Sequence, residues 1–207
     1  MPHLPGVFVH PTALVESDQI GPGTKIWAHV HVMKGAVIGP DCNICDQAFI
    51  ESGAVLGRGV TVKIGARICD GVTIGDGVFV GPGVEFTNDR RPRSRRAAPC
   101  AARYDNLDWL ERTSVGDGAT LGARVIVGCG IRLGDWCFAT AGSVVIRDVA
   151  PFSQVQGNPA RPMGYVCVCS QSMQLEDGQA ECLDCGRRYK LEGRMLVPAQ
   201  QIVLFEV

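Results

Sequence analysis

An aliphatic or aromatic residue returns at every sixth position of this chain, without a miss, from Phe8 to Phe86. The series is Phe8, Leu14, Ile20, Ile26, Val32, Ile38, Ile44, Ile50, Leu56, Val62, Ile68, Ile74, Val80 and Phe86. A small or short-branched residue lies two positions before each member from Ile26 onward. A period of six differs from the period of an α-helix, from that of a coiled coil and from plain strand alternation. We therefore expect a short strand followed by a corner, repeated along the chain.

Three six-residue faces close one triangular coil of about 18 residues, with the large side chain inside each face and the small one at the corner. A single coil cannot bury its own face, but coils stacked at the strand spacing of ~4.8 Å share one continuous core. The repeat therefore predicts an all-β fold, a parallel β-helix of hexapeptide repeats, over residues 1–165. The alternative is an ordinary sandwich of short strands, for which such an unbroken series would be a coincidence.

The repeat stops after Phe86 and resumes one residue out of phase at Val115, which predicts a long inserted loop over residues 87–114. Five arginines lie between Arg90 and Arg96. Long loops within compact domains are commonly functional, and clustered guanidinium groups favour an anionic ligand such as a phosphate. We expect Arg93 and Ser94 to contact the substrate. The alternative is a solvated loop, or one that contacts a neighbouring subunit.

Four of the ten cysteines are clustered in residues 166–207, whereas the other six are scattered through the repeat and the loop. The clustered set consists of Cys167, Cys169, Cys182 and Cys185. Two closely spaced pairs joined by a hairpin-length segment are typical of tetrahedral zinc sites with four thiolate ligands. The first pair is one residue shorter than the usual C-x-x-C. We expect a small zinc-ribbon-like module with structural zinc; the alternatives are a disulfide or a metal-free segment docked on the β-helix.

Composition limits the partners and the compartment. A net charge of −1 provides no overall attraction to nucleic acid or to a membrane surface, and 46% hydrophobic residues with 26 glycines suit a folded β protein. No apolar run approaches the ~20 residues of a transmembrane helix, and the N-terminus does not read as a signal peptide. We therefore expect a cytoplasmic protein with neither nucleic-acid nor membrane partners.

Several strings within residues 8–165 resemble a known family. They are Phe8-Val9-His10-Pro11-Thr12-Ala13, Ile20-Gly21-Pro22-Gly23-Thr24-Lys25-Ile26-Trp27, Cys42-Asn43-Ile44-Cys45-Asp46, Phe49-Ile50-Glu51, Phe86-Thr87-Asn88-Asp89 with Pro92-Arg93-Ser94, Gly142-Ser143-Val144-Val145 and Gly157-Asn158-Pro159-Ala160-Arg161. The chain resembles the hexapeptide-repeat acyltransferases with a left-handed parallel β-helix. Within them it is similar to the bacterial nucleotide-sugar N-acetyltransferases of the UDP-2-acetamido-3-amino-2,3-dideoxyglucuronate type. Its loop is richer in arginine and alanine than such an enzyme would suggest.

The resemblance implies an acetyl-CoA-dependent N-acetyltransferase that acts on a nucleotide-linked amino sugar. It also implies a homotrimer, with acetyl-CoA in the groove between neighbouring β-helices and the nucleotide sugar near the inserted loop. By the same resemblance, Asn88 orients the acceptor amine. Gly142 and Asn158 contact CoA, and Arg161 is suited to its phosphates.

His31 is the candidate general base, because histidine is the usual proton acceptor near neutral pH. Counted in coils, its column runs through Phe49 and Arg67 to Glu85, so Asn88 lies near that column but outside it. The alternatives are a corner or interface role for His31, with the departing thiolate of CoA taking the proton instead.

Glu51 and Asp70 follow buried hexad positions closely, and either carboxylate could contact the acceptor. The alternative for both is a hydrogen-bonded corner group. Three further functions remain to be weighed: a sugar O-acetyltransferase, a non-catalytic β-helix scaffold, and a β-helix carbonic anhydrase. The last needs three histidines on one zinc ion, and no histidine follows His31, so the sequence argues against it.

Overall fold

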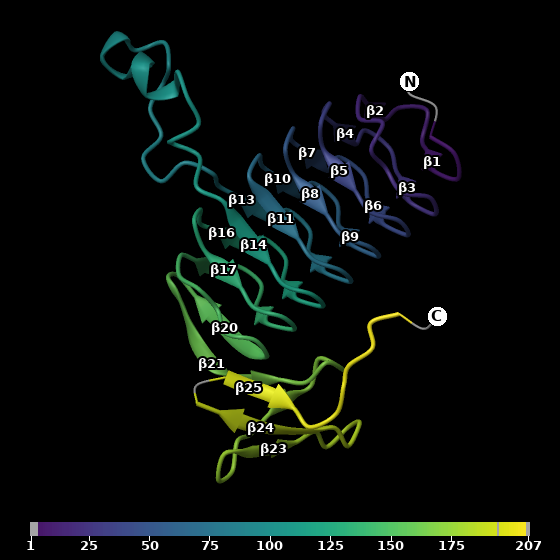
Figure 1. The fold of residues 1–207 in the computed structure, drawn as a ribbon, viewed down its shortest axis with the longest axis vertical. Coiled ribbons are helices and arrows are strands. Elements are labelled where there is room, and N and C mark those ends of the chain that lie inside the picture. The colour runs from purple at the N-terminus through teal and green to yellow at the C-terminus, as the bar shows by residue number, and fades with distance from the viewer. Residues whose placement is uncertain (1–3, 194, 206–207) are drawn as a thin grey trace.

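The predicted β-helix is confirmed by the computed structural model, which describes residues 4–193 and 195–205. The chain winds into a parallel β-solenoid of about eight turns, and each turn adds one short strand to each of three sheets (Figure 1). Residues one coil apart are register partners: Lys25 pairs with Asn43, and Asn43 pairs with Thr61. The predicted coil length therefore matches the observed register.

Sheet A is the longest of the three solenoid sheets and has ten strands. In spatial order they are β1 (Phe8–Val9), β3 (Lys25–Ile26), β6 (Asn43–Ile44), β9 (Thr61–Val62), β12 (Phe79–Val80), β15 (Thr120–Leu121), β18 (Phe138–Ala139), β20 (Ser153–Gly157), β21 (Ala160–Val166) and β22 (Ser172–Met173). The first eight run parallel, whereas β21 and β22 are antiparallel additions. Sheet A therefore continues out of the solenoid into the C-terminal segment.

Sheets B and C form the other two walls. Sheet B contains β19 (Val144–Val145), β16 (Ile126–Val127), β13 (Glu85–Phe86), β10 (Arg67–Ile68), β7 (Phe49–Ile50), β4 (His31–Val32) and β2 (Leu14–Val15). Sheet C contains β17 (Arg132–Leu133), β14 (Thr113–Val115), β11 (Val72–Ile74), β8 (Val55–Leu56) and β5 (Val37–Ile38). The chain runs from A to B to C in each turn, so each coil has one corner between each pair of sheets.

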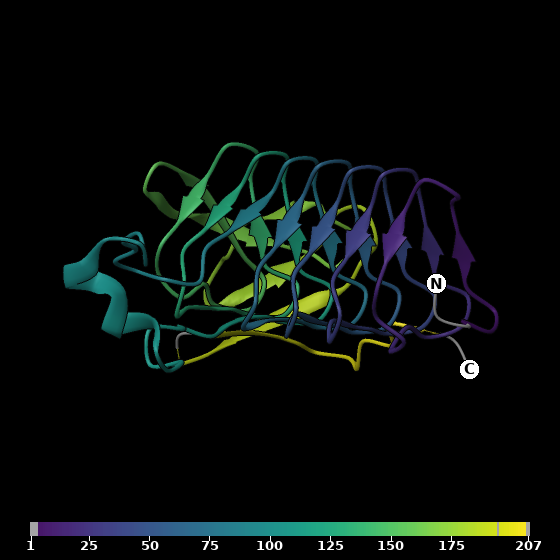
Figure 2. The same ribbon diagram turned by 90° about the horizontal axis from the view of Figure 1, so that it is seen from above.

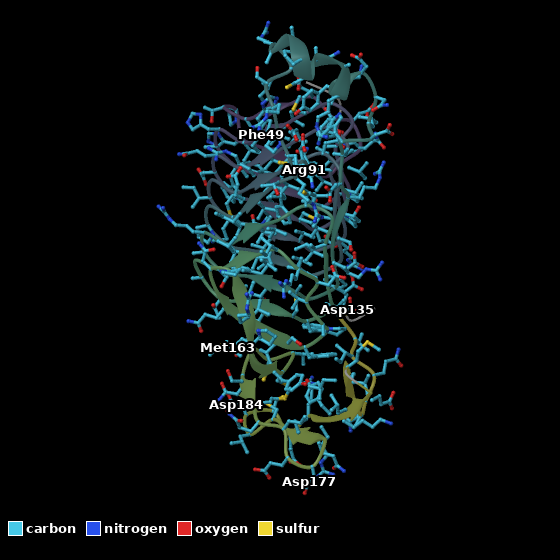
Figure 3. The ribbon with its side chains drawn as sticks, turned by 90° about the vertical axis from the view of Figure 1, so that its left-hand side faces the viewer. Phe49, Arg91, Asp135, Met163, Asp177 and Asp184 are labelled. Atoms are coloured by element: carbon cyan, nitrogen blue, oxygen red, sulfur yellow. The ribbon has the colours of Figure 1, made fainter. Side chains whose placement is uncertain are left out.

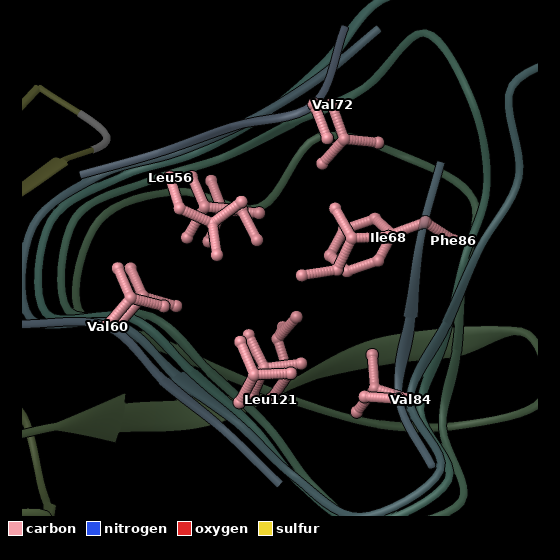
Figure 4. Packing of buried hydrophobic residues seen from close by; sticks show 14 of the residues in the cluster. Leu56, Val60, Ile68, Val72, Val84, Phe86 and Leu121 are labelled. Carbon is pink, nitrogen blue, oxygen red and sulfur yellow. The ribbon is translucent and has the colours of Figure 1, made fainter. Parts of the chain in front are cut away.

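The hexad residues fill the triangular interior (Figure 4). Leu56 from sheet C, Ile68 from sheet B and Leu121 from sheet A all point inward and are at most 1% exposed. Each such side chain contributes about 1.5–3 kcal/mol by leaving water. The small residues of the pattern, such as Ala54 and Ala66, lie fully buried at the corners. The period of six is thus the spacing of one inward residue per face.

The inserted loop leaves the solenoid at the corner between sheets B and C. Strand β13 ends at Phe86 and β14 begins at Thr113, so the irregular segment spans 87–112. It extends away from the coils and carries a short 3₁₀ helix, η1 (Ala98–Tyr104) (Figures 1 and 2). Strand β14 pairs with β11 in normal register, so the solenoid resumes at Thr113, two residues before the predicted resumption at Val115. Within 4–193 and 195–205 no helix has the length and apolarity needed to cross a membrane.

The C-terminal segment folds into a small module below the last coil. Its three-stranded antiparallel sheet consists of β23 (Gln179–Glu181), β24 (Arg188–Glu192) and β25 (Met195–Pro198). A second apolar cluster, which includes Phe152 and Tyr189, joins it to the end of the solenoid. The chain then returns along the coils as an extended strap (199–205), visible in yellow in Figures 1 and 2. The Phe205 ring lies 4.6 Å from the guanidinium carbon of Arg58.

Candidate active site at the sheet B–sheet C corner

Three of the predicted site residues, Glu51, Asp70 and Asn88, are stacked at one corner of three successive coils. The Glu51 carboxylate accepts a hydrogen bond from the backbone N–H of Asp70, with an O–N distance of 2.8 Å. The carbonyl oxygen of Asp70 in turn accepts a hydrogen bond from the Asn88 side-chain amide at 3.4 Å. All three are half-buried. The solenoid therefore brings together groups that are 18 and 19 residues apart in sequence.

The Asn88 amide has a defined orientation. Its Nδ2 faces the carbonyl oxygen of Asp70, and its backbone carbonyl accepts the N–H of Glu111 at 3.0 Å. With Nδ2 engaged, Oδ1 is directed elsewhere and can accept a hydrogen bond from an incoming amine. The side chain thus has the polarity that an amine-orienting residue needs.

Cys69 lies at the same corner and is a protonated thiol. Burial, followed by the negative charge of Glu51, raises the pKa of Cys69 to about 12. The thiol donates to the carbonyl oxygen of Phe86 at 3.1 Å. Because the thiolate is the nucleophilic form, Cys69 is unsuited to an acyl-enzyme mechanism.

Asp89 is the hydrogen-bonding centre of the inserted loop. Its side chain is only 7% exposed and accepts hydrogen bonds from the backbone N–H of Arg91, the Arg103 guanidinium and the Tyr104 hydroxyl. Burial by itself would raise the pKa of Asp89. These three donors outweigh that effect and hold the pKa below its ordinary value. The Asp89 carboxylate therefore organises the loop directly beside Asn88.

A cavity of about 500 Å³ opens beside Asn88 within the loop. It is lined by Asn88, Asp89, Pro92, Arg93, Arg95, Tyr104, Asn106, Leu107 and Trp109. The Tyr104 and Trp109 rings meet edge to face, with their centroids 5.5 Å apart. Its walls combine aromatic, amide and guanidinium groups, a combination suited to a polar ring with an anionic substituent.

Three of the loop arginines form ion pairs within the loop. Arg90, Arg95 and Arg103 form ion pairs with Glu111, Asp105 and Asp89, respectively. Arg93 lines the cavity, and its backbone N–H donates to Tyr104 Oη at 2.8 Å. Its neighbour Ser94 is exposed at the loop surface. Part of the loop's positive charge is thus neutralised by ion pairs within the loop. Arg93 lines the same cavity as Asn88.

His31 lies on the outer face of sheet B, away from this corner. Its Nε2 is 3.1 Å from the Glu16 carboxylate, and its ring meets Phe49 edge to face. The observed register places Phe49, Arg67 and Glu85 in one column above it, as the coil count predicts. Within one chain, three strand spacings therefore separate His31 from Glu85.

The three residues predicted to contact CoA lie at the other end of the solenoid. Gly142 is in a turn between sheets A and B, with a φ of 73°. The adjacent Ser143 hydroxyl accepts the backbone N–H of Gly157 at 3.3 Å, which ties this turn to the β20–β21 hairpin carrying Asn158 and Arg161. Arg161 is exposed. The structure thus places these three in one region, separate from the Asn88 corner.

The four clustered cysteines converge in the C-terminal module. Their Sγ atoms all lie within 4.8 Å of one another, and the Cys167–Cys185 and Cys169–Cys182 pairs are 3.4 and 3.5 Å apart. This group can hold a metal ion. Figure 3 shows Arg91 of the loop and Asp184 of the second cysteine turn far apart along the molecule. A metal in the module is therefore remote from the Asn88 corner.

Five further residues shape the candidate site although they were not predicted from the sequence: Asp89, Tyr104, Trp109, Arg90 and Glu111. A lone acid among arginines marks Asp89, and two of the few aromatic residues mark Tyr104 and Trp109. The pairing of Arg90 with Glu111 joins the two ends of the loop. Nothing in the local sequence signals it.

The class of the protein follows from the repeat and its fold. Residues 19–52 and 53–88 match the family described as bacterial transferase hexapeptide (six repeats). The acetyltransferase domain of PglB from Neisseria gonorrhoeae FA1090 shares the fold with 22% identity and a TM-score of 0.52, over 76% of this chain and 57% of that one. A maltose O-acetyltransferase from Clostridium difficile 630 does so with 24% identity and a TM-score of 0.52, over 63% and 69%. This chain thus spans little more than half the length of the PglB structure.

A more similar relative is the dTDP-3-amino-3,6-dideoxy-alpha-D-galactopyranose 3-N-acetyltransferase of Aneurinibacillus thermoaerophilus. It is 47% identical over 183 residues, which cover 88% of this chain and 90% of the relative. The matched length exceeds the predicted 1–165 domain, so the similarity extends into the C-terminal segment. This protein belongs to the hexapeptide-repeat acyltransferase family.

Proposed function

We propose that this protein transfers acetyl from acetyl-CoA to the amino group of a nucleotide-linked amino sugar, with a dTDP-linked 3-amino-3,6-dideoxyhexose as the first candidate acceptor. The observation that carries the proposal is the 47% identity, over nearly the whole of both chains, to a relative with that name. The acceptor in that name is a dTDP-linked sugar, whereas the sequence resemblance suggests a UDP-linked uronic acid. The nucleotide and the sugar are therefore both open to test. The arginine-rich loop is consistent with either nucleotide.

The acceptor amine approaches the Asn88 corner from the loop cavity. Asn88 Oδ1 accepts one N–H of the neutral amine and aims the nitrogen lone pair at the thioester carbonyl. Attack forms the C–N bond and expels CoA as the thiolate, which takes the proton that nitrogen loses. Holding the two reactants in line supplies most of the acceleration. No general base is needed in this scheme. His31 then has a corner or interface role on the outer face of sheet B.

Glu51 and Asp70 support the same site. Glu51 fixes the Asp70 backbone, which fixes the Asn88 amide. Arg93 and Ser94 contact the nucleotide from the loop. Gly142, Asn158 and Arg161 contact CoA, and the exposed Arg161 guanidinium can meet a phosphate.

The Asn88 corner and the region of Gly142, Asn158 and Arg161 flank the outer face of sheet B, one on each side. A homotrimer, with acetyl-CoA in the groove between neighbouring solenoids, would bring them to one site. Exposed apolar side chains on the outer faces support assembly: Leu14 is 54% exposed and Ile126 is 41% exposed. Light scattering coupled to size exclusion tests this, and a monomeric mass for an active preparation would exclude a shared site.

Structural zinc in the C-terminal module is part of the proposal. Zinc–thiolate distances of about 2.3 Å require sulfur atoms somewhat under 4 Å apart in a tetrahedron. The Cys167–Cys185 and Cys169–Cys182 pairs have such spacing. Four thiolates fill the coordination shell, so the ion would stabilise the module and take no part in acetyl transfer. Elemental analysis of reduced protein should find one zinc per chain.

The activity is tested by incubating the purified protein with acetyl-CoA and a panel of dTDP- and UDP-linked amino sugars. Released thiol is followed by a chromogenic disulfide, and product mass identifies the acetylated position. We expect turnover with a 3-amino sugar. Acetylation of the hydroxyl analogue alone would make the protein an O-acetyltransferase, and absence of CoA binding at millimolar concentration would leave the scaffold alternative.

A further inference from the structure

The ends of the inserted loop are joined by one ion pair, Arg90 with Glu111. Nε of Arg90 lies 3.0 Å from both carboxylate oxygens of Glu111, and Nη2 lies 2.6 Å from Oε2. Nη2 also donates to the carbonyl oxygen of Cys129 in the next coil at 3.4 Å. The guanidinium therefore bridges both ends of the loop and the solenoid wall beneath them.

The solenoid provides a fitted seat for this pair at Gly130. This glycine has a φ of 72°, and a Cβ added there would lie 2.4 Å from Oε2 of Glu111 and 3.0 Å from Nη2 of Arg90. Glu111 is 34% exposed although it belongs to a surface loop. The Glu111 carboxylate is thus packed against backbone, whereas the Arg90 side chain is 60% exposed on its outer side.

A second contact defines the same end of the loop. The Leu110 side chain packs over Gly71, where an added Cβ would lie 3.1 Å from Leu110 Cδ1. Gly71 directly follows Asp70. The returning chain is therefore seated against the coils on either side of the loop before it re-enters the solenoid at Thr113.

The pair is connected to Asn88 through the backbone. The N–H of Glu111 donates to the carbonyl oxygen of Asn88, and Arg90 follows Asn88 by two residues. Any shift of Glu111 is therefore transmitted to the peptide that carries Asn88. An exposed ion pair contributes little to stability, typically below ~1 kcal/mol, so its main effect is on geometry.

We infer that Arg90 and Glu111 are positioning residues for the acetyl transfer, which set the location of Asn88 by clamping the loop ends on Gly130. The inference rests on the proposed function. It predicts that breaking the clamp lowers kcat, because small displacements of an aligned group reduce the rate steeply. The KM for acetyl-CoA should change little, because the residues proposed to contact CoA, Gly142 and Arg161, belong to the last coils and the β20–β21 hairpin.

The experiment compares Arg90→Ala, Glu111→Gln and the double variant with the wild type. Each should lower kcat about tenfold or more, with the KM for acetyl-CoA within about twofold and the melting temperature nearly unchanged. The double variant should be no worse than the poorer single variant, because both break one unit. Ethylguanidinium should restore part of the kcat of Arg90→Ala and none of that of Glu111→Gln.

The control is Arg188→Lys, which perturbs a more exposed ion pair, with Glu181, in the remote module. It should leave kcat unchanged. Wild-type kcat in Arg90→Ala and Glu111→Gln, or equal losses in all variants that follow a fall in melting temperature, would overturn the inference. Inactivity of the wild type with every acceptor would instead refute the proposed function.

Discussion

Asn88 donates its side-chain amide to the carbonyl oxygen of Asp70, one coil earlier, across the corner at which the inserted loop begins. The contact engages Nδ2, so the side-chain Oδ1 of Asn88 can accept a hydrogen bond from a ligand. A residue held in this way can orient a ligand without reorganising as the ligand binds. We therefore propose the corner, more than any single residue, as the functional unit of the chain.

Asn88→Ala should lower kcat by about 10²-fold, a loss typical of one preorganised hydrogen-bonding group. The melting temperature should stay close to that of the wild type, because the amide is half-buried and its bond to Asp70 is long. Steady-state kinetics and calorimetry measure the two quantities. Asn43→Ala, which removes an amide from sheet A, is the matched control; equal activity of both variants would remove Asn88 from the site.

Asp89→Asn should loosen the loop while leaving the solenoid intact. The change removes the charge that Arg103 and the neighbouring donors stabilise, at a cost of about 1–3 kcal/mol to loop structure. Hydrogen exchange should rise in 90–110 and stay unchanged in the coils, and the KM for the nucleotide sugar should increase. Unchanged exchange in the loop would contradict the role assigned to Asp89.

The same carboxylate predicts a pH dependence. Because the pKa of Asp89 is lowered in the folded protein, its stabilisation is complete above the ordinary value of 3.8. It is lost as the pH falls through the lowered pKa. Acid titration followed by hydrogen exchange should therefore show an ordered loop at neutral pH and loosening only below 3.8. Asp89→Asn should lack this transition.

Cys69 should resist alkylation at neutral pH, because its pKa is raised to about 12 and the thiolate is scarcely populated. Mass spectrometry after iodoacetamide treatment of the native protein measures this. Cys69→Ala should retain acetyl transfer. Rapid modification of Cys69, accompanied by loss of activity, would argue for a nucleophilic thiol.

Gly59→Ala should destabilise the protein, since Gly59 has a φ of 65° and an added Cβ would lie 2.7 Å from the Phe205 ring. Gly65→Ala is the matched control, because its φ of 68° is close to that of Gly59 and no atom lies within 4 Å of the added Cβ. Backbone strain alone costs about 1–3 kcal/mol. Gly59→Ala should cost more, and Phe205→Ala should remove the excess. Equal melting temperatures for the two glycine variants would mean that the strap does not dock there.

Much of the fold was predictable because a short-range sequence pattern specifies it. Each hexad places one large residue inward and one small residue at a corner, and the burial of Ile44 and Ala54 matches that pattern. The interruption after Phe86 was visible for the same reason. The cysteine pairs were predictable as a cluster, because each pair occupies a single turn.

The remaining features depend on where the chain returns after long excursions. Glu51, Asp70 and Asn88 meet only because coils stack in register, and Arg90 meets Glu111 only because the loop closes on Gly130. The return of Phe205 to Gly59 is a contact of the same kind. The sequence by itself determined the coil, the position of the break and the cysteine group, since these follow from short-range periodicity and spacing. Only the tertiary structure decided which polar groups share the corner, because that depends on packing between residues far apart in the chain.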